Sequence, residues 1–172
     1  SDLGYFNGYL HIGVGAGGTI LISTDNGNTW NLETHGTQTL YDIAVVQEMM
    51  SNSLVIVGAG GTILKGTNNF GMWSWDFEMS STSNTLRSII KGTDALVAVG
   101  HSGTTVTKGN MDMSWISRYF SGTTNTLRDI AWNGSAYTAV GDSSTILRNY
   151  CGTEGACSYW APQRPALNPE DF

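Results

Sequence analysis

Short apolar runs bounded by Gly, Asn or Ser recur along the whole chain. In one clear stretch, Leu-x-x-Ile at 40–43 is followed by an apolar run into Val-Gly at 54–58, and then by Thr-Ile-Leu at 62–64. A further run begins at Trp75. Runs of β-branched and aromatic residues separated by Asn-Gly or Gly-Gly are typical of β-strands joined by tight turns. The pattern predicts an all-β chain.

The same set of landmarks occurs four times. The glycine that ends the second run recurs at spacings of 43, 42 and 41 residues, and a tryptophan follows it in every copy. These landmarks are Gly15, Gly58, Gly100 and Gly141, and Trp30, Trp75, Trp115 and Trp160. They predict repeats at about 1–39, 40–85, 86–126 and 127–160, followed by a tail at 161–172 that contains all three prolines.

Each repeat holds four strand-like runs, and four short antiparallel strands cannot bury both of their faces alone. The copies must therefore stack, and a ring of such sheets is a β-propeller. We predict a single domain, a small β-propeller of four four-stranded antiparallel blades. The weak first run at 2–5 and the prolines of the tail offer no obvious latching strand. The blades therefore either close a ring by face packing or form part of a larger oligomeric assembly.

One turn carries a family motif. The segment 23–30 matches the Asp-box, Ser-x-Asp-x-Gly-x-Thr-Trp, at every specified position. The chain therefore resembles the BNR or Asp-box repeat β-propellers, which include sialidases, photosystem II assembly factors and repeat proteins of bacterial surfaces and phage tails. The looser repeat pattern is most similar to the non-enzymatic members. The resemblance implies a structural role, facing away from the ligand-binding end, for Ser23, Asp25, Gly27, Thr29 and Trp30.

In that family the carboxylate accepts hydrogen bonds in the turn, the glycine takes a positive φ and the tryptophan packs between blades. The fourth copy replaces the box with a loop that contains both cysteines, Cys151 and Cys157. Alignment of the copies suggests a disulfide that clamps this loop, and two free thiols are the alternative. A disulfide favours an oxidising compartment. Together with the resemblance, this predicts an extracellular or virion location.

The sequence lacks a catalytic constellation. His11, His35 and His101 fall in different parts of the repeat and make no ligand set. A sialidase needs three arginines on its substrate, whereas only Arg87 and Arg128 occupy equivalent positions, and the matching places hold Tyr41 and Asp2. We predict no enzymatic activity, no cofactor and no metal.

The loops between second and third strands, and the joins between blades, gather at one end of a propeller. Five polar or aromatic residues there are the candidate ligand-binding residues: Tyr41, Arg87, His101, Arg128 and Asp142. In the alternative interpretation, the arginines pair with Asp129 or Asp142 and only hold the blades together.

Charge and hydrophobicity limit the partners. The net charge is −6, and eight Lys and Arg are spread thinly, which argues against nucleic acid. No apolar run approaches the roughly 20 residues of a membrane span. Methionines and tryptophans at 72–75 and 111–113 mark either a protein contact or packing between blades.

We therefore predict a non-catalytic interaction or structural module, a phage virion or tail component or an extracellular surface protein, that binds a protein or cell-surface receptor. Association with further copies of the chain is compatible with this prediction. A glycan-binding lectin is the alternative. A sialidase-like glycoside hydrolase and an assembly chaperone are the other functions that the resemblance leaves open.

Overall fold

The computed structural model describes residues 3–6, 10–47, 52–69, 71–118, 121–149 and 159–163. Within them the chain forms four antiparallel sheets of four strands each. Sheet 1 contains β1 (Leu3–Phe6), β2 (Leu10–Val14), β3 (Thr19–Ser23) and β4 (Asn31–Thr34). Sheet 2 contains β5 (Leu40–Gln47), β6 (Asn52–Gly58), β7 (Ile63–Asn69) and β8 (Met72–Glu78). Sheet 3 contains β9 (Leu86–Lys91), β10 (Ala95–Gly100), β11 (Thr105–Gly109) and β12 (Ile116–Arg118). Sheet 4 contains β13 (Leu127–Trp132), β14 (Tyr137–Gly141), β15 (Thr145–Asn149) and β16 (Ala161–Pro162).

The predicted all-β fold of four four-stranded sheets is thus confirmed. Every sheet is an up-and-down meander in chain order. One boundary differs from the sequence prediction, because the first two residues of the predicted tail, Ala161 and Pro162, pair with Arg148 and Leu147 as the outer strand of sheet 4. Proline is tolerated there because an edge strand leaves one side of its backbone unpaired.

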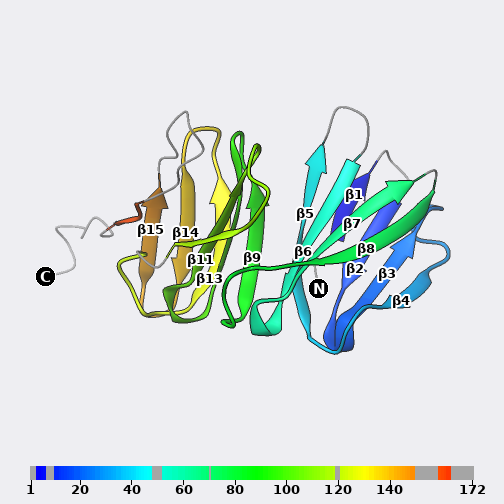
Figure 1. Ribbon diagram of the computed structural model, residues 1–172, viewed down its shortest axis with the longest axis horizontal. Coiled ribbons are helices and arrows are strands. Elements are labelled where there is room, and N and C mark those ends of the chain that lie inside the picture. Colours follow the sequence, from blue (N-terminus) through cyan, green and yellow to red (C-terminus); the bar gives the residue numbers. More distant parts are fainter. Residues whose placement is uncertain are drawn as a thin grey trace, which may run out of the picture.

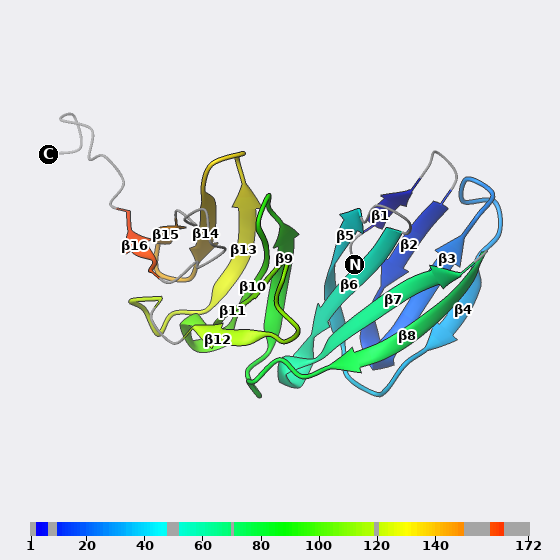
Figure 2. The ribbon, with the colours of Figure 1, turned by 45° about the horizontal axis from the view of Figure 1, so that its top comes forward.

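The sheets stand in a row in chain order, with sheet 1 at one end and sheet 4 at the other (Figure 1). The first strand of each sheet is its inner strand: β5 packs against β1 and β9, and β9 packs against β13. Figure 2 shows the same order from a second direction. Each sheet therefore contacts its neighbours in the sequence through its broad faces.

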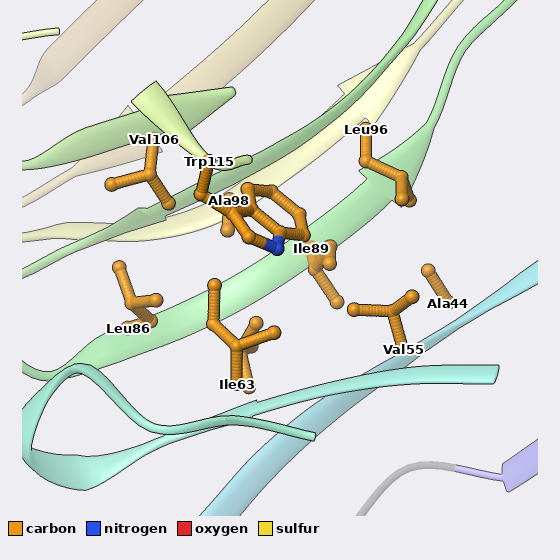
Figure 3. Packing of buried hydrophobic residues seen from close by; sticks show 10 residues of the cluster. Ala44, Val55, Ile63, Leu86, Ile89, Leu96, Ala98, Val106 and Trp115 are labelled. Carbon is orange, nitrogen blue, oxygen red and sulfur yellow. The ribbon is translucent and has the colours of Figure 1, made fainter. Parts of the chain in front are cut away.

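A separate hydrophobic core fills each of the three spaces between consecutive sheets. Figure 3 shows the middle one, where Val55 and Ile63 of sheet 2 meet Ala98, Val106 and Trp115 of sheet 3. Burying one such aliphatic side chain contributes about 1.5–3 kcal/mol, so each interface rests on several such contributions. Side chains alternate between the two faces of a strand, which is why one repeat supplies residues to two cores.

Two names describe these faces. The leading face of a sheet packs against the preceding sheet, and the trailing face packs against the next one. The strand register places equivalent residues at matching points. Leu21, Leu64, Val106 and Leu147 share one position on the leading face, and Val14, Val57, Val99 and Val140 share one on the trailing face.

Three short 3-10 turns join the second and third strands of the first three sheets: η1 (Ala16–Gly18), η2 (Ala59–Gly61) and η3 (His101–Gly103). Their last glycine has no room for a side chain. A Cβ on Gly103 would lie 1.9 Å from the carbonyl oxygen of Thr123, in addition to its φ of +65°. The end of the molecule that holds these turns and the joins between sheets is called the loop end, and the opposite end is called the hairpin end.

The loop end is held together by a repeated backbone hydrogen bond. The amide of Ala59 donates to the carbonyl of Thr39 at 2.8 Å, and His101 donates to Thr85 in the same way at 2.9 Å. Sheet 4 repeats the contact from Asp142 to Thr126. In these three sheets the turn is thereby fixed to the residue that precedes the inner strand of the same sheet, which places turn side chains beside the first residues of that strand.

Candidate binding site at the loop end

Three equivalent inner-strand residues make one polar network across sheets 2, 3 and 4. The hydroxyl of Ser88 lies 2.7 Å from Oδ2 of Asp42 and 2.9 Å from Oδ1 of Asp129. The amide of Ile89 also donates to Oδ2 of Asp42, at 2.7 Å. The two aspartates further accept from the amides of the residues that follow them. The network links three sheets through side chains at one repeat position.

This network has an excess of acceptors. A serine hydroxyl has one proton, so Ser88 donates to only one of the two carboxylates at a time. The other carboxylate receives no proton from Ser88. Sheets 2 and 4 have an aspartate at this repeat position, and the neutral serine of sheet 3 keeps a third carboxylate from lying between them. The alignment of the repeats could have identified this network, because Asp42, Ser88 and Asp129 each stand two residues after the leucine that begins the first strand of their repeat.

In sheet 4, the predicted residues Arg128 and Asp142 form an ion pair. Nε of Arg128 donates to Oδ1 of Asp142, and Nη2 lies 3.3 Å from Oδ2. The hydrogen bond to Asp142 raises the pKa of Arg128, and the same bond lowers the pKa of Asp142. The sequence left two roles open for Arg128, ligand binding or pairing with an aspartate; in the structure it pairs with Asp142.

Arg87 of sheet 3 is bound differently. Its Nε and Nη2 lie 3.0 and 2.9 Å from Nε2 of His101, and its guanidinium carbon lies 4.9 Å from the ring centroid of Tyr41. Because a guanidinium has no acceptor, Nε2 of His101 accepts, and in this arrangement the imidazole is neutral with its proton on Nδ1. Within the described residues Arg87 has no carboxylate partner at ion-pair distance.

The five predicted residues therefore lie in two groups at the same end: Tyr41, Arg87 and His101 bridge sheets 2 and 3, whereas Arg128 and Asp142 belong to sheet 4. The two groups interact, because the charge of Arg87 adds to the hydrogen bond from Arg128, the largest cause, in lowering the pKa of Asp142. We call this surface the rim. It contains one cation stacked on an aromatic ring and one cation neutralised by a carboxylate. Asp2 lies outside the described residues.

The Asp25 turn lies at the hairpin end, away from the rim. Asp25 accepts from the hydroxyl and the amide of Thr29 at 2.6 and 2.8 Å and from Ser23 at 2.9 Å. These bonds, that from the Thr29 hydroxyl first, lower the pKa of Asp25 to about 2. Gly27 has a φ of +86°, as the motif implies. The turn is held by its own bonds and by one contact to β2, between Nε2 of His11 and Oδ1 of Asn26 at 3.1 Å.

The expected position of Trp30 between blades was wrong. Trp30 is 44% exposed and donates to the carbonyl of Gly27 in its own turn at 3.1 Å. The other tryptophans of the repeat do lie at interfaces. Trp75 donates to Glu33 of sheet 1 at 2.9 Å, and Trp115 donates to Glu78 of sheet 2 at 2.6 Å. The repeat tryptophan packs on the preceding sheet, and no described sheet precedes sheet 1.

The apolar tip residues divide by type. Trp73 and Trp75 pack against the core between sheets 1 and 2, so for them packing between blades is the correct alternative. The methionines of these two tips are exposed: Met72, Met111 and Met113. The proposed disulfide between Cys151 and Cys157 lies outside the described residues.

A cleft of about 790 Å³ opens between sheets 2 and 3 towards the hairpin end, and all three lysines of the chain line it. Lys108 is paired with Glu78 at 2.7 Å, and Lys91 donates to the carbonyls of Gly92 and Thr93 at 2.5 and 3.1 Å. Burial lowers the pKa of Lys91. Two of the ammonium groups are thus engaged by the chain itself, so this cleft is a weaker candidate than the rim.

Within the described residues, no three His, Cys, Asp or Glu side chains are grouped so as to hold a metal ion. Across the same residues, no helix has the length and apolar character that a membrane crossing requires.

No family model matches the chain, and no curated protein matches it. Solved structures do. A structure of YCF48 bound to a D1 peptide superposes with a TM-score of 0.69 at 18% identity, over 96% of this chain and 53% of that one. YCF48 from Cyanidioschyzon merolae gives a TM-score of 0.68 at 15% identity, over 96% and 56%. The likeness identifies the fold as that of a β-propeller. The chain spans about half the length of these structures.

Proposed function

We propose that the chain is a non-catalytic β-propeller module that binds a segment of a partner protein at the rim. The observation that supports this most directly is Arg87. Its guanidinium is oriented by Tyr41 and His101, yet neither of these neutralises its charge. An arginine held in this way is preorganised to bind a carboxylate bidentately, and little side-chain entropy remains to be lost.

The rest of the rim suits a polypeptide. Asp129 bonds to Ser88, the residue after Arg87, and Asp142 is close enough for the charge of Arg87 to lower its pKa; both offer acceptors for the amides of an extended segment. The repeated turns present backbone groups along the same end. That a protein of this fold was obtained with a bound peptide supports the same class of partner. The partner segment that fits would place an acidic side chain or a terminal carboxylate on Arg87.

A lectin fits the rim less well. Sugar rings bind proteins by stacking on aromatic faces, and one face of Tyr41 is already covered by Arg87. An extracellular or virion setting, and the absence of catalytic activity, are part of the proposal and rest on the sequence: on the resemblance, the cysteine pair and the missing catalytic constellation.

Selection from a displayed random-peptide library tests the proposal. The native chain should enrich sequences with Asp, Glu or a free terminus, and those peptides should bind the Arg87→Ala, Arg128→Ala double variant at least tenfold more weakly. The double variant should melt within a few degrees of the native chain. Unchanged peptide binding would refute the rim as the site, and a collapse of folding would assign the arginines to structure. Binding only to a glycan array would favour the lectin.

A further inference from the structure

The two end faces of the row are apolar but uncovered. On the leading face of sheet 1, Leu21 is 36% exposed, whereas its equivalents Leu64, Val106 and Leu147 are 0%, 0% and 1% exposed. The internal copies of this position are buried because each packs against a preceding sheet. Sheet 1 therefore carries the same contact surface without a described sheet to cover it.

Sheet 4 shows the complementary situation. On its trailing face Val140 is 42% exposed, whereas Val14, Val57 and Val99 are 3%, 0% and 0% exposed. Its neighbour across the ladder, Ile146, is half-buried, whereas Ile20 and Ile63 at the same position are fully buried. The row thus begins with an open leading face and ends with an open trailing face.

The positions of a polar contact found at two of the three internal interfaces are also present at both ends. At those two interfaces a leading-face tryptophan donates to a trailing-face glutamate, Trp75 to Glu33 and Trp115 to Glu78. At one end the equivalent indole, that of Trp30, is 44% exposed and donates to the carbonyl of Gly27 in its own turn. At the other end the backbone amide of Gln163 donates to the carbonyl of Ile146 at 2.8 Å. Gln163 thus occupies the position in sheet 4 that Glu33, the partner of Ile20, occupies in sheet 1. A glutamine has an oxygen that accepts a hydrogen bond as glutamate does.

We propose that the leading face of sheet 1 binds the trailing face of sheet 4 of a second copy of this chain. Two such contacts, one at each end, close a ring of two chains. The contact has the form that occurs three times within the chain, so no new type of interface is needed. The chain presents both complementary faces itself.

Native mass spectrometry and sedimentation of the full chain at tens of micromolar test this proposal. The native chain should be a dimer. Leu21→Lys and Val140→Lys should each be monomeric, because in each variant both contacts of the dimer contain one altered face. An equal mixture of the two should form a heterodimer, because one of its contacts joins two unaltered faces. Met111→Lys, on a 95% exposed tip side chain, should remain a dimer.

The mixture separates assembly from folding, since a variant that did not fold would not be rescued by its complement. A native chain that is monomeric, or that forms an open series of larger species, would overturn the proposal. So would a Val140→Lys variant that stays dimeric while Leu21→Lys does not, because that outcome means that two leading faces pair with each other.

Discussion

The indole Nε1 of Trp115 donates a 2.6 Å hydrogen bond to Oε2 of Glu78 on the preceding sheet. The other oxygen of the same carboxylate accepts from Nζ of Lys108 of sheet 3 at 2.7 Å. One side chain of sheet 2 therefore satisfies two donors of sheet 3, and both bonds lie beside the middle hydrophobic core.

Replacing Glu78 by Ala should destabilise the chain by about 1–3 kcal/mol, because it leaves a buried indole donor without an acceptor. Chemical denaturation followed by tryptophan fluorescence would measure the change. Asp76→Ala, an exposed position on the same strand, is the control and should change the stability by less than about 0.5 kcal/mol. Equal effects of the two substitutions would contradict the role given to Glu78.

Ser88 separates two carboxylates, so its replacement by Asp should be more harmful than its replacement by Ala. Ala removes one hydrogen bond, worth about 1 kcal/mol. Asp places a third carboxylate next to Asp42 and Asp129, and like charges disfavour the ionised forms in the folded state. The extra penalty is complete above the raised pKa of the folded state and should diminish as the pH falls from there towards the ordinary carboxyl pKa.

Denaturation curves of both Ser88 variants between pH 7 and pH 4 would show this convergence. Ser83→Asp, at an exposed position in the join before β9, controls for the added charge. If the Asp and Ala variants differed by the same amount at every pH, the charge argument would be wrong.

Asp25 should titrate with a pKa of about 2 in the folded chain, against an ordinary value of 3.8. Because the folded pKa is lowered, the stabilisation from this carboxylate is present above pH 3.8 and is lost as the pH falls through about 2. Thr29→Ala removes the largest cause and should raise the pKa towards its ordinary value. A ¹³C carboxyl titration measures it, with Thr24→Ala as the control. No difference between these variants would contradict the assigned bonds.

Tyr137 should titrate far above a typical tyrosine. Burial, more than any other cause, raises its pKa to about 12, while its hydroxyl donates to the carbonyl of Ala95 at 2.7 Å. Its contribution to stability is therefore complete below pH 10 and is lost as the pH rises through about 12.

Tyr137→Phe should cost about 1 kcal/mol at pH 7, because a buried hydrogen bond is lost and the carbonyl of Ala95 keeps only the amide of Gly92 as its donor. It should also remove part of the alkaline destabilisation seen in denaturation curves. Tyr159→Phe, on a 69% exposed ring, is the matched control and should change neither quantity. An equal loss in both variants would contradict the role of the buried hydroxyl.

The sequence was sufficient for the sheets and for the location of the rim residues, because both follow from repeat position. Gly58 and Trp75 recur at fixed spacing, and every residue aligned with Tyr41 must fall at the same point of its own sheet. The different bonding of Arg87 and Arg128 was not predictable, since it depends on whether the turn residue is His101 or Asp142 and on where those side chains point.

The exposure of Trp30 shows the other limit of sequence reasoning. Its motif is intact, and its local bonds are those the motif implies. Burial of its ring depends on a neighbouring sheet, which a local motif cannot supply. The same limit applies to Pro162, which pairs with Leu147 in the outer strand of sheet 4. Whether a strand lies at the edge of a sheet depends on its neighbours, so the proline alone did not show that it could be part of a strand.

Mapping one bound peptide on the chain shows whether the rim binds a protein segment. A peptide enriched on the native chain is added to the ¹⁵N-labelled chain, and amide shifts are followed. The largest shifts should fall at 39–42, 85–88, 101–104, 126–129 and 142–145, and Arg87→Ala should abolish them. Shifts confined to the hairpin end, at the Asp25 turn or around Lys65, Lys91 and Lys108, would contradict binding at the rim.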